Sequence, residues 1–189
     1  MMKIGIILLA AGRSERFGSD KRCAPWPGQE CLLKASAQQA QQSGLPCYVV
    51  MHPGDRILTE QCLPKGVMSG ICPDAAAGIG HSIAFGVHAN QGWDGWIIAR
   101  ADMPWVTPEA YLLLARHLYE HDCARPVDRE GRAGFPTAFR KEHAFALMRL
   151  GGNRNEVRLI PDDPSCLILV DDDMIHADVT TPDDLPQAG

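Results

Sequence analysis

The feature that most constrains this chain is an apolar run that stops abruptly at a loop of small and cationic residues. The run Ile4–Leu9 predicts a buried strand, and Ala10–Lys21 follows it with two glycines and three cations. Small residues at the end of a strand let an anion approach backbone N–H groups, and nearby Arg and Lys side chains balance its charge. We therefore expect a phosphate site in this loop. The residues that would form it are Gly12, Gly18, Arg13, Arg16 and Lys21.

The spacing within this loop excludes two common nucleotide-binding motifs. A Walker loop requires G-x-x-x-x-G-K-[ST], but five residues separate Gly12 from Gly18, and two more separate Gly18 from Lys21. A dinucleotide fingerprint requires three glycines as G-x-G-x-x-G, and the loop has two. Neither a P-loop ATPase nor a Rossmann dehydrogenase is therefore indicated.

Length and composition are typical of one globular domain. The chain has 189 residues, of which 46% are hydrophobic and 22% charged, so we expect a single domain spanning residues 1–189. A net charge of −5 argues against a nucleic-acid partner, which would require a strongly basic face. No apolar run is long enough to span a membrane, and the seven cysteines form no C-x-x-C pair. We therefore expect a cytoplasmic protein with reduced thiols and no membrane partner.

A second apolar run brings a single carboxylate to the end of a strand. The run Trp96–Ala101 predicts a strand, which Asp102 follows and Pro104 ends. In open parallel sheets ligands bind at the carboxyl ends of strands, and Mg²⁺ prefers carboxylate oxygens together with substrate phosphates. We predict that Asp102 is a ligand of Mg²⁺. An Asp that only caps the next turn is the alternative.

The remaining segments alternate between strand and helix patterns. We expect strands at Cys47–Met51, Val67–Cys72 and Ser165–Val170, and helices over residues 30–42 and from Thr107 onward. This alternation predicts a three-layer α/β/α fold around a mostly parallel sheet.

A glycine-punctuated segment predicts another helix that begins near Gly80. The first turn of such a helix would direct free N–H groups towards a bound nucleotide, and Ser82 would add a hydroxyl. The alternative is a helix start that is capped for stability alone.

The first loop resembles a family signature. Leu9–Lys21 fills every fixed position of L-A-[AG]-G-x-[SG]-x-R-[MF]-G-x-x-K, the signature of the molybdenum-cofactor nucleotidyltransferases, and Asp102–Pro104 is similar to the D-M-P motif of that family. The resemblance implies a Rossmann-like fold of the nucleotide-diphospho-sugar transferase type. It also implies Mg²⁺-dependent transfer of a nucleoside monophosphate from a nucleoside triphosphate to a phosphorylated acceptor, with release of pyrophosphate. Catalytic roles would fall on Lys21, Arg16 and Asp102, and nucleotide contacts on Leu9, Ala10, Ala11, Gly12, Arg13, Gly80 and Ser82.

The same resemblance carries an expectation about the substrates. Relatives with L-A-A-G tend to use CTP and those with L-A-G-G tend to use GTP, so Ala11 implies CTP. The acceptor would be molybdopterin, and a molybdenum hydroxylase would receive the product. Sugar-phosphate and other alcohol-phosphate nucleotidyltransferases share the first loop, so they remain alternatives.

Several positions depart from the family pattern, and three of them bear on activity. Phe135 stands where relatives have His, Val157 where they have Arg, and Thr180 where they have Asp or Asn. Residues Asp178–Leu185 are still similar to the closing motif D-[IV]-[DN]-T-P-x-D-L, which implies that Asp178 is a second metal ligand. A hydroxyl is a poorer ligand of Mg²⁺ than a carboxylate, so we expect weaker metal binding or activity. A protein that binds a nucleotide or cofactor without turnover also remains open.

Overall fold

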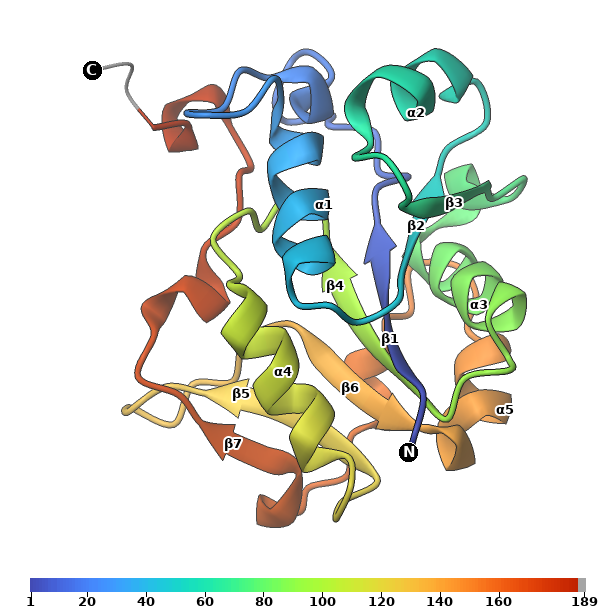
Figure 1. Ribbon diagram of the computed structural model, residues 1–189, viewed down its shortest axis with the longest axis vertical. Coiled ribbons are helices and arrows are strands. Elements are labelled where there is room, and N and C mark those ends of the chain that lie inside the picture. Colours follow the sequence, from blue (N-terminus) through green and yellow to red (C-terminus); the bar gives the residue numbers. More distant parts are fainter. Residues whose placement is uncertain (187–189) are drawn as a thin grey trace.

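A seven-stranded sheet forms the centre of the molecule (Figure 1), with the strand order β3-β2-β1-β4-β6-β5-β7. The computed structural model describes residues 1–186 apart from the side chain of Asp173, so the last three residues of the predicted domain, 187–189, lie outside it. β6 runs antiparallel to β4 and β5, while the other neighbouring strands pair in parallel, which confirms the mostly parallel sheet. The strands are β1 (Ile4–Leu9), β2 (Cys47–Met51), β3 (Met68–Ile71), β4 (Gly95–Arg100), β5 (Cys123–Val127), β6 (Thr137–Arg140) and β7 (Leu167–Leu169).

Helices cover both faces of the sheet and complete the three-layer α/β/α fold (Figure 1). α1 and α4 pack on one face, and α3 and α5 pack on the other. Their bounds are α1 (Leu32–Gln42), α2 (Arg56–Cys62), α3 (Ile79–Ala89), α4 (Pro108–His117) and α5 (Ala144–Met148). In the described part of the chain, no helix combines the length and the apolar character needed to cross a membrane.

The central strand β1 is apolar throughout because both of its faces are covered. Ile6 and Leu8 face the core under α1 and α4, whereas Ile7 faces the core under α3. All three side chains are fully buried. A strand that is buried on both faces reads as a continuous apolar run and does not alternate with polar residues, which is why the sequence predicts β1 with its correct bounds.

The close approach of α3 to the sheet depends on a glycine. A Cβ atom at Gly86 would lie 2.5 Å from Cγ2 of Ile7, which is well inside van der Waals contact. The absence of a side chain at this position lets the helix lie directly on β1. The first turn of α3 is thereby held beside the carboxyl end of β1.

The strand β5 was not predicted from the sequence. Its segment contains Pro126 between charged residues, a pattern that indicates a turn because proline cannot donate to a sheet ladder. In the structure, the pairing of β5 with β6 covers only Cys123 and Ala124, so Pro126 lies beyond the end of that ladder. The predicted helix over residues 30–42 begins at Leu32, two residues later than expected.

Candidate active site

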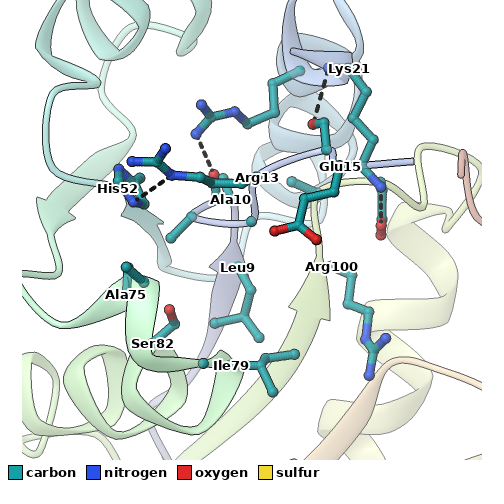
Figure 2. Close-up of a pocket in the computed structure, with 18 of the residues that line it drawn as sticks. Leu9, Ala10, Arg13, Glu15, Lys21, His52, Ala75, Ile79, Ser82 and Arg100 are labelled. Carbon is teal, nitrogen blue, oxygen red and sulfur yellow. Dashed lines mark hydrogen bonds and ion pairs between the residues drawn. The ribbon is translucent and has the colours of Figure 1, made fainter. Parts of the chain in front are cut away.

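The site lies where three parallel strands end side by side. Leu9 of β1 is aligned with Val50 of β2 and with Arg100 of β4, so the carboxyl ends of these strands meet at one edge of the sheet. A cavity of about 380 Å³ opens there (Figure 2). The predicted residues that line it are Leu9, Ala10, Ala11, Gly12, Arg13, Lys21, Ser82 and Asp102. The structure therefore brings the first loop and the mid-chain carboxylate into one cavity.

Lys21 and Asp102 form an ion pair across this cavity. Nζ of Lys21 lies 2.7 Å from Oδ2 of Asp102, and it also donates to the carbonyl oxygen of Val179 at 2.8 Å. The loop that carries Lys21 is fixed by its backbone N–H, which donates to Oγ of Ser14 at 3.1 Å. The cation and the anion thus neutralise each other in the free protein. A polyphosphate bound with a metal ion would give each of them a new partner.

The free oxygen of Asp102 fits the role of a metal ligand. Oδ1 is buried, and no atom in the described part of the chain forms a hydrogen bond with it. A buried carboxylate oxygen without a partner is costly, and a cation supplies what is missing. Among the described residues, no group of three or more His, Cys, Asp or Glu side chains could hold a metal by itself. A site with one or two carboxylates that relies on substrate phosphates for its other ligands is typical of Mg²⁺.

The structure leaves three of the predicted site residues outside the cavity lining, namely Asp178, Arg16 and Gly80. Asp178 is exposed. It lies beside the site, because the next residue, Val179, donates its N–H to the carbonyl oxygen of Asp102 at 2.8 Å. Arg16 is exposed as well. The metal role of Asp178 and the catalytic role of Arg16 stay predictions.

Arg13 is held against one wall of the cavity by a buried histidine. Nε of Arg13 donates to Nε2 of His52 at 3.2 Å (Figure 2). Because an arginine nitrogen can only donate, Nε2 must accept, and the ring proton lies on Nδ1. Nδ1 is 2.6 Å from the carbonyl oxygen of Pro53, which accepts that proton. His52 is therefore a neutral support for Arg13.

Arg22 fixes the base of the loop, although the sequence did not indicate a role for it. Nη1 donates to the carbonyl oxygen of Ala10 at 2.7 Å, and the guanidinium pairs with the carboxylates of Asp20 and Asp55. Burial alone lowers the pKa of Arg22, but the two carboxylates more than offset this and raise it. Asp55 comes from the turn before α2, so no local pattern could have revealed this cluster.

The start of α3 offers fewer free backbone N–H groups to a ligand than the sequence suggests. Ser82 lines the cavity. The N–H of Gly80 is not free, because it donates to the carbonyl oxygen of Gly152 at 2.9 Å. A Cβ atom at Gly80 would lie 2.7 Å from the backbone nitrogen of Gly151, so the glycine permits close packing of this turn. A contact between Gly80 and a nucleotide stays a prediction.

Other polar residues that line the cavity have no counterpart in the sequence predictions. Glu15 points into it from the loop, and Arg100 lies on the side opposite Arg13 (Figure 2). Asn153 enters from the turn that packs on α3. The sequence gives little indication of a role for these residues, because an isolated polar residue in a loop or at a strand end is usually exposed to solvent.

Comparisons with known proteins agree with this geometry. Residues 6–165 match the model of the family described as the MobA-like NTP transferase domain. The "Probable molybdenum cofactor guanylyltransferase" of Mycobacterium avium is 29% identical over 192 residues, which cover 97% of this chain and 94% of that protein.

Solved structures show the same fold. The crystal structure of Rv0371c from Mycobacterium tuberculosis superposes with a TM-score of 0.84 at 23% identity, covering 97% of this chain and 95% of that one. Molybdopterin-guanine dinucleotide biosynthesis protein A from Archaeoglobus fulgidus gives a TM-score of 0.68 at 17% identity, covering 95% and 94%. The predicted fold of the nucleotide-diphospho-sugar transferase type is confirmed. Because the family match spans most of the sequence, the chain belongs to the MobA-like NTP transferases and is a nucleotidyltransferase of that type.

Proposed function

We propose that this protein transfers a nucleoside monophosphate from a nucleoside triphosphate to the phosphate of molybdopterin and releases pyrophosphate. The observation that carries the proposal is the shared cavity, in which Lys21 of the first loop pairs with Asp102 of the second motif at 2.7 Å. The name of the Mycobacterium avium relative supports molybdopterin as the acceptor.

The chemistry needs positioning and charge neutralisation more than proton transfer. An oxygen of the acceptor phosphate attacks the α-phosphorus, a new P–O bond forms, and the bond to the β-phosphate breaks with its electrons leaving on pyrophosphate. A phosphate monoester is already largely dianionic at neutral pH, because its second pKa is about 6. No general base is then required. Lys21 and Arg13 would hold the leaving phosphates.

A divalent metal, which we propose to be Mg²⁺, would supply further charge neutralisation on the phosphates when bound. Asp102 would hold it through its unpartnered oxygen, with Asp178 as the second ligand after a change in its side-chain position. A structure of Rv0371c was determined in complex with manganese, and it superposes with a TM-score of 0.78 at 21% identity, covering 96% of this chain and 95% of that one. That structure supports the proposal because it shows a divalent cation bound to a protein of the same fold.

For the nucleobase we propose cytosine, from the resemblance at Ala11, and guanine is the second candidate. Ala11 is buried and lines the cavity, so its methyl group takes up space that a glycine at this position would leave open. The second candidate rests on the name of the Mycobacterium avium relative, which is a guanylyltransferase.

The deciding experiment measures pyrophosphate release with molybdopterin and each of the four nucleoside triphosphates. We expect release with CTP above the others, and a shift towards GTP in the variant Ala11→Gly, which removes the methyl group. Pyrophosphate release with GTP alone would show that the protein uses guanine, the second candidate, and not cytosine. Release only when a sugar phosphate or another alcohol phosphate is supplied would identify a different transferase.

Binding of nucleotide and molybdopterin without any pyrophosphate release would identify a carrier and would overturn the proposal. If the product forms, we propose that a molybdenum hydroxylase receives it. Mixing the loaded protein with such a hydroxylase in its cofactor-free form, and measuring recovered hydroxylase activity, tests that step.

A further inference from the structure

A guanidinium without a polar partner lies at the end of the cavity away from Lys21. Arg100 is the last residue of β4, and its side chain points away from Lys21 (Figure 2). Among the described side chains, which exclude that of Asp173, its buried Nε has no hydrogen-bond partner and its guanidinium forms no ion pair. The contact that holds it is the ring of Phe135, with Cζ 4.0 Å from the ring centroid. Aromatic faces attract guanidinium groups in this arrangement.

A second arginine at the same ring, Arg125, differs from Arg100 because its guanidinium already has hydrogen-bond partners. Cζ of Arg125 lies 5.5 Å from the centroid of Phe135. Its Nε donates to the carbonyl oxygen of Gly134 at 3.1 Å, and it lies outside the cavity lining. Arg125 is therefore engaged with its own hairpin, whereas Arg100 has donors left for a ligand.

A buried carboxylate accompanies Arg100. Glu156 is 1% exposed, and its Oε1 accepts a hydrogen bond from Oγ1 of Thr137 at 3.1 Å. Its Oε2 has no hydrogen-bond partner in the described chain. Burial raises the pKa of Glu156, and the positive charge of Arg100 opposes this effect. Glu156 is therefore near enough to interact electrostatically with Arg100, and among the described side chains it forms no ion pair that would occupy the donors of that guanidinium.

The geometry of phosphoryl transfer indicates which substrate enters at this end of the cavity. In a displacement at phosphorus, the attacking and leaving oxygens lie roughly in line on opposite sides. If pyrophosphate leaves towards Arg13 and Lys21, the acceptor must enter from the other side. Arg100 is the cation there, since Arg22, which also lines the cavity, is paired with two carboxylates.

We propose that Arg100 binds the phosphate monoester of the acceptor, and that Phe135 and Glu156 are positioning residues that orient its guanidinium. This inference rests on the proposed function. A planar guanidinium can give a phosphate two parallel hydrogen bonds, which fixes its orientation as well as its position. A lysine at this position is a point charge, so it would still attract the phosphate but would not fix its orientation.

The test separates the two substrates of one reaction. In Arg100→Met we expect KM for molybdopterin to rise about tenfold or more, the effect of losing charge-assisted hydrogen bonds, while KM for the nucleoside triphosphate changes less than about twofold. Arg100→Lys should show an intermediate KM for molybdopterin. The matched control is Arg125→Met, which removes the other arginine at the same ring and should leave both KM values nearly unchanged.

The role of the ring is tested by a pair of variants. Phe135→Leu should raise KM for molybdopterin several-fold through loss of the cation–aromatic contact, and Phe135→Tyr should restore it because the ring is kept. Glu156→Gln should raise the same KM and leave that for the nucleotide unchanged. If Arg100→Met does not fold, as judged by its thermal unfolding, the Leu and Tyr variants at position 135 decide the question.

The outcomes distinguish this inference from the proposed function. Absence of pyrophosphate release by the wild-type protein with any acceptor would end the proposed function. An active wild-type protein whose Arg100→Met variant keeps an unchanged KM for molybdopterin would overturn the inference alone. Calorimetric titration of molybdopterin into the protein provides a readout without turnover, and the variant should bind it about tenfold more weakly or worse.

Discussion

At the scale of single residues, Asp102 is the position on which activity should depend most. We expect Asp102→Asn to fold normally and to lower metal-dependent turnover about 100-fold or more, because the amide keeps the size of the side chain but loses the charge that a cation needs. Pyrophosphate release at increasing Mg²⁺ concentration measures this. Asp183→Asn changes an exposed carboxylate outside the cavity lining and serves as the control. Wild-type turnover in the Asp102 variant would refute its assignment.

Lys21 should control affinity for the triphosphate. Removing its ammonium group in Lys21→Ala takes away a charge-assisted contact to phosphate, so we expect nucleotide binding to weaken about tenfold. Titration calorimetry with a nucleoside triphosphate measures the change, and Lys65→Ala, which removes an exposed lysine outside the cavity lining, is the comparison. Equal affinity in the Lys21 variant and the wild type would contradict this expectation.

The sequence predicts residues that act next to strand ends and misses those whose partners are distant. Lys21 and Asp102 belong to motifs that directly follow β1 and β4, so their meeting in one cavity follows from the parallel sheet. The guanidinium of Arg22 pairs with the carboxylate of Asp55, and the guanidinium of Arg100 lies over the ring of Phe135. These partners come from other elements, so only the folded chain brings them together.

At the scale of elements, burial on both faces decided which strands could be predicted. β1 and β2 have the predicted bounds because apolar runs of that kind have few other structures available. α2 and α5 were not predicted, since each is short and follows a turn-rich or charged segment. Their positions are set by packing in the folded molecule, which outweighs the weak local preference of so few residues.

The packing of α3 on β1 can be tested at a single glycine. In Gly86→Ala the added Cβ would meet Ile7 at 2.5 Å, so the helix or the strand must shift. We expect a loss of about 1–3 kcal/mol in the free energy of unfolding, the usual cost of overpacking a core. Urea unfolding measures it. Gly92→Ala, where nothing lies within 4 Å of the new atom, should be nearly neutral, and equal stability of the two variants would contradict the packing argument.

At the scale of the whole molecule, the C-terminal segment joins distant parts of the sheet to the site. The carbonyl oxygen of Ile175 accepts from the N–H of Phe135 at 2.9 Å, and the backbone of Val179 bonds both Asp102 and Lys21. Nε2 of His176 lies 2.9 Å from Oδ2 of Asp128, which anchors the segment to the turn after β5. The wall of the cavity therefore depends on contacts made far from the chemistry, which no motif in the sequence indicates.

Asp128 makes this anchoring dependent on pH. Burial alone raises its pKa, but the backbone N–H and guanidinium of Arg132 and the ring of His176 outweigh burial and lower the pKa to about 2. An aspartate in the unfolded chain has a pKa of about 3.9, so the folded carboxylate binds its proton less readily. The stability that it contributes is therefore present above about pH 4 and is lost as the pH falls towards 2.

The variant Asp128→Asn should reveal this dependence directly. We expect it to be less stable than the wild type near neutral pH, because the amide cannot accept the same charge-assisted bonds, and we expect the difference to shrink as the pH falls from about 4 to about 2. Urea unfolding of both proteins across this range measures the difference. Asp162→Asn alters an exposed carboxylate and should show no such trend. A stability difference that stays constant down to the lowest pH would mean that the charge of Asp128 contributes nothing, and that the anchoring of the C-terminal segment depends on shape alone.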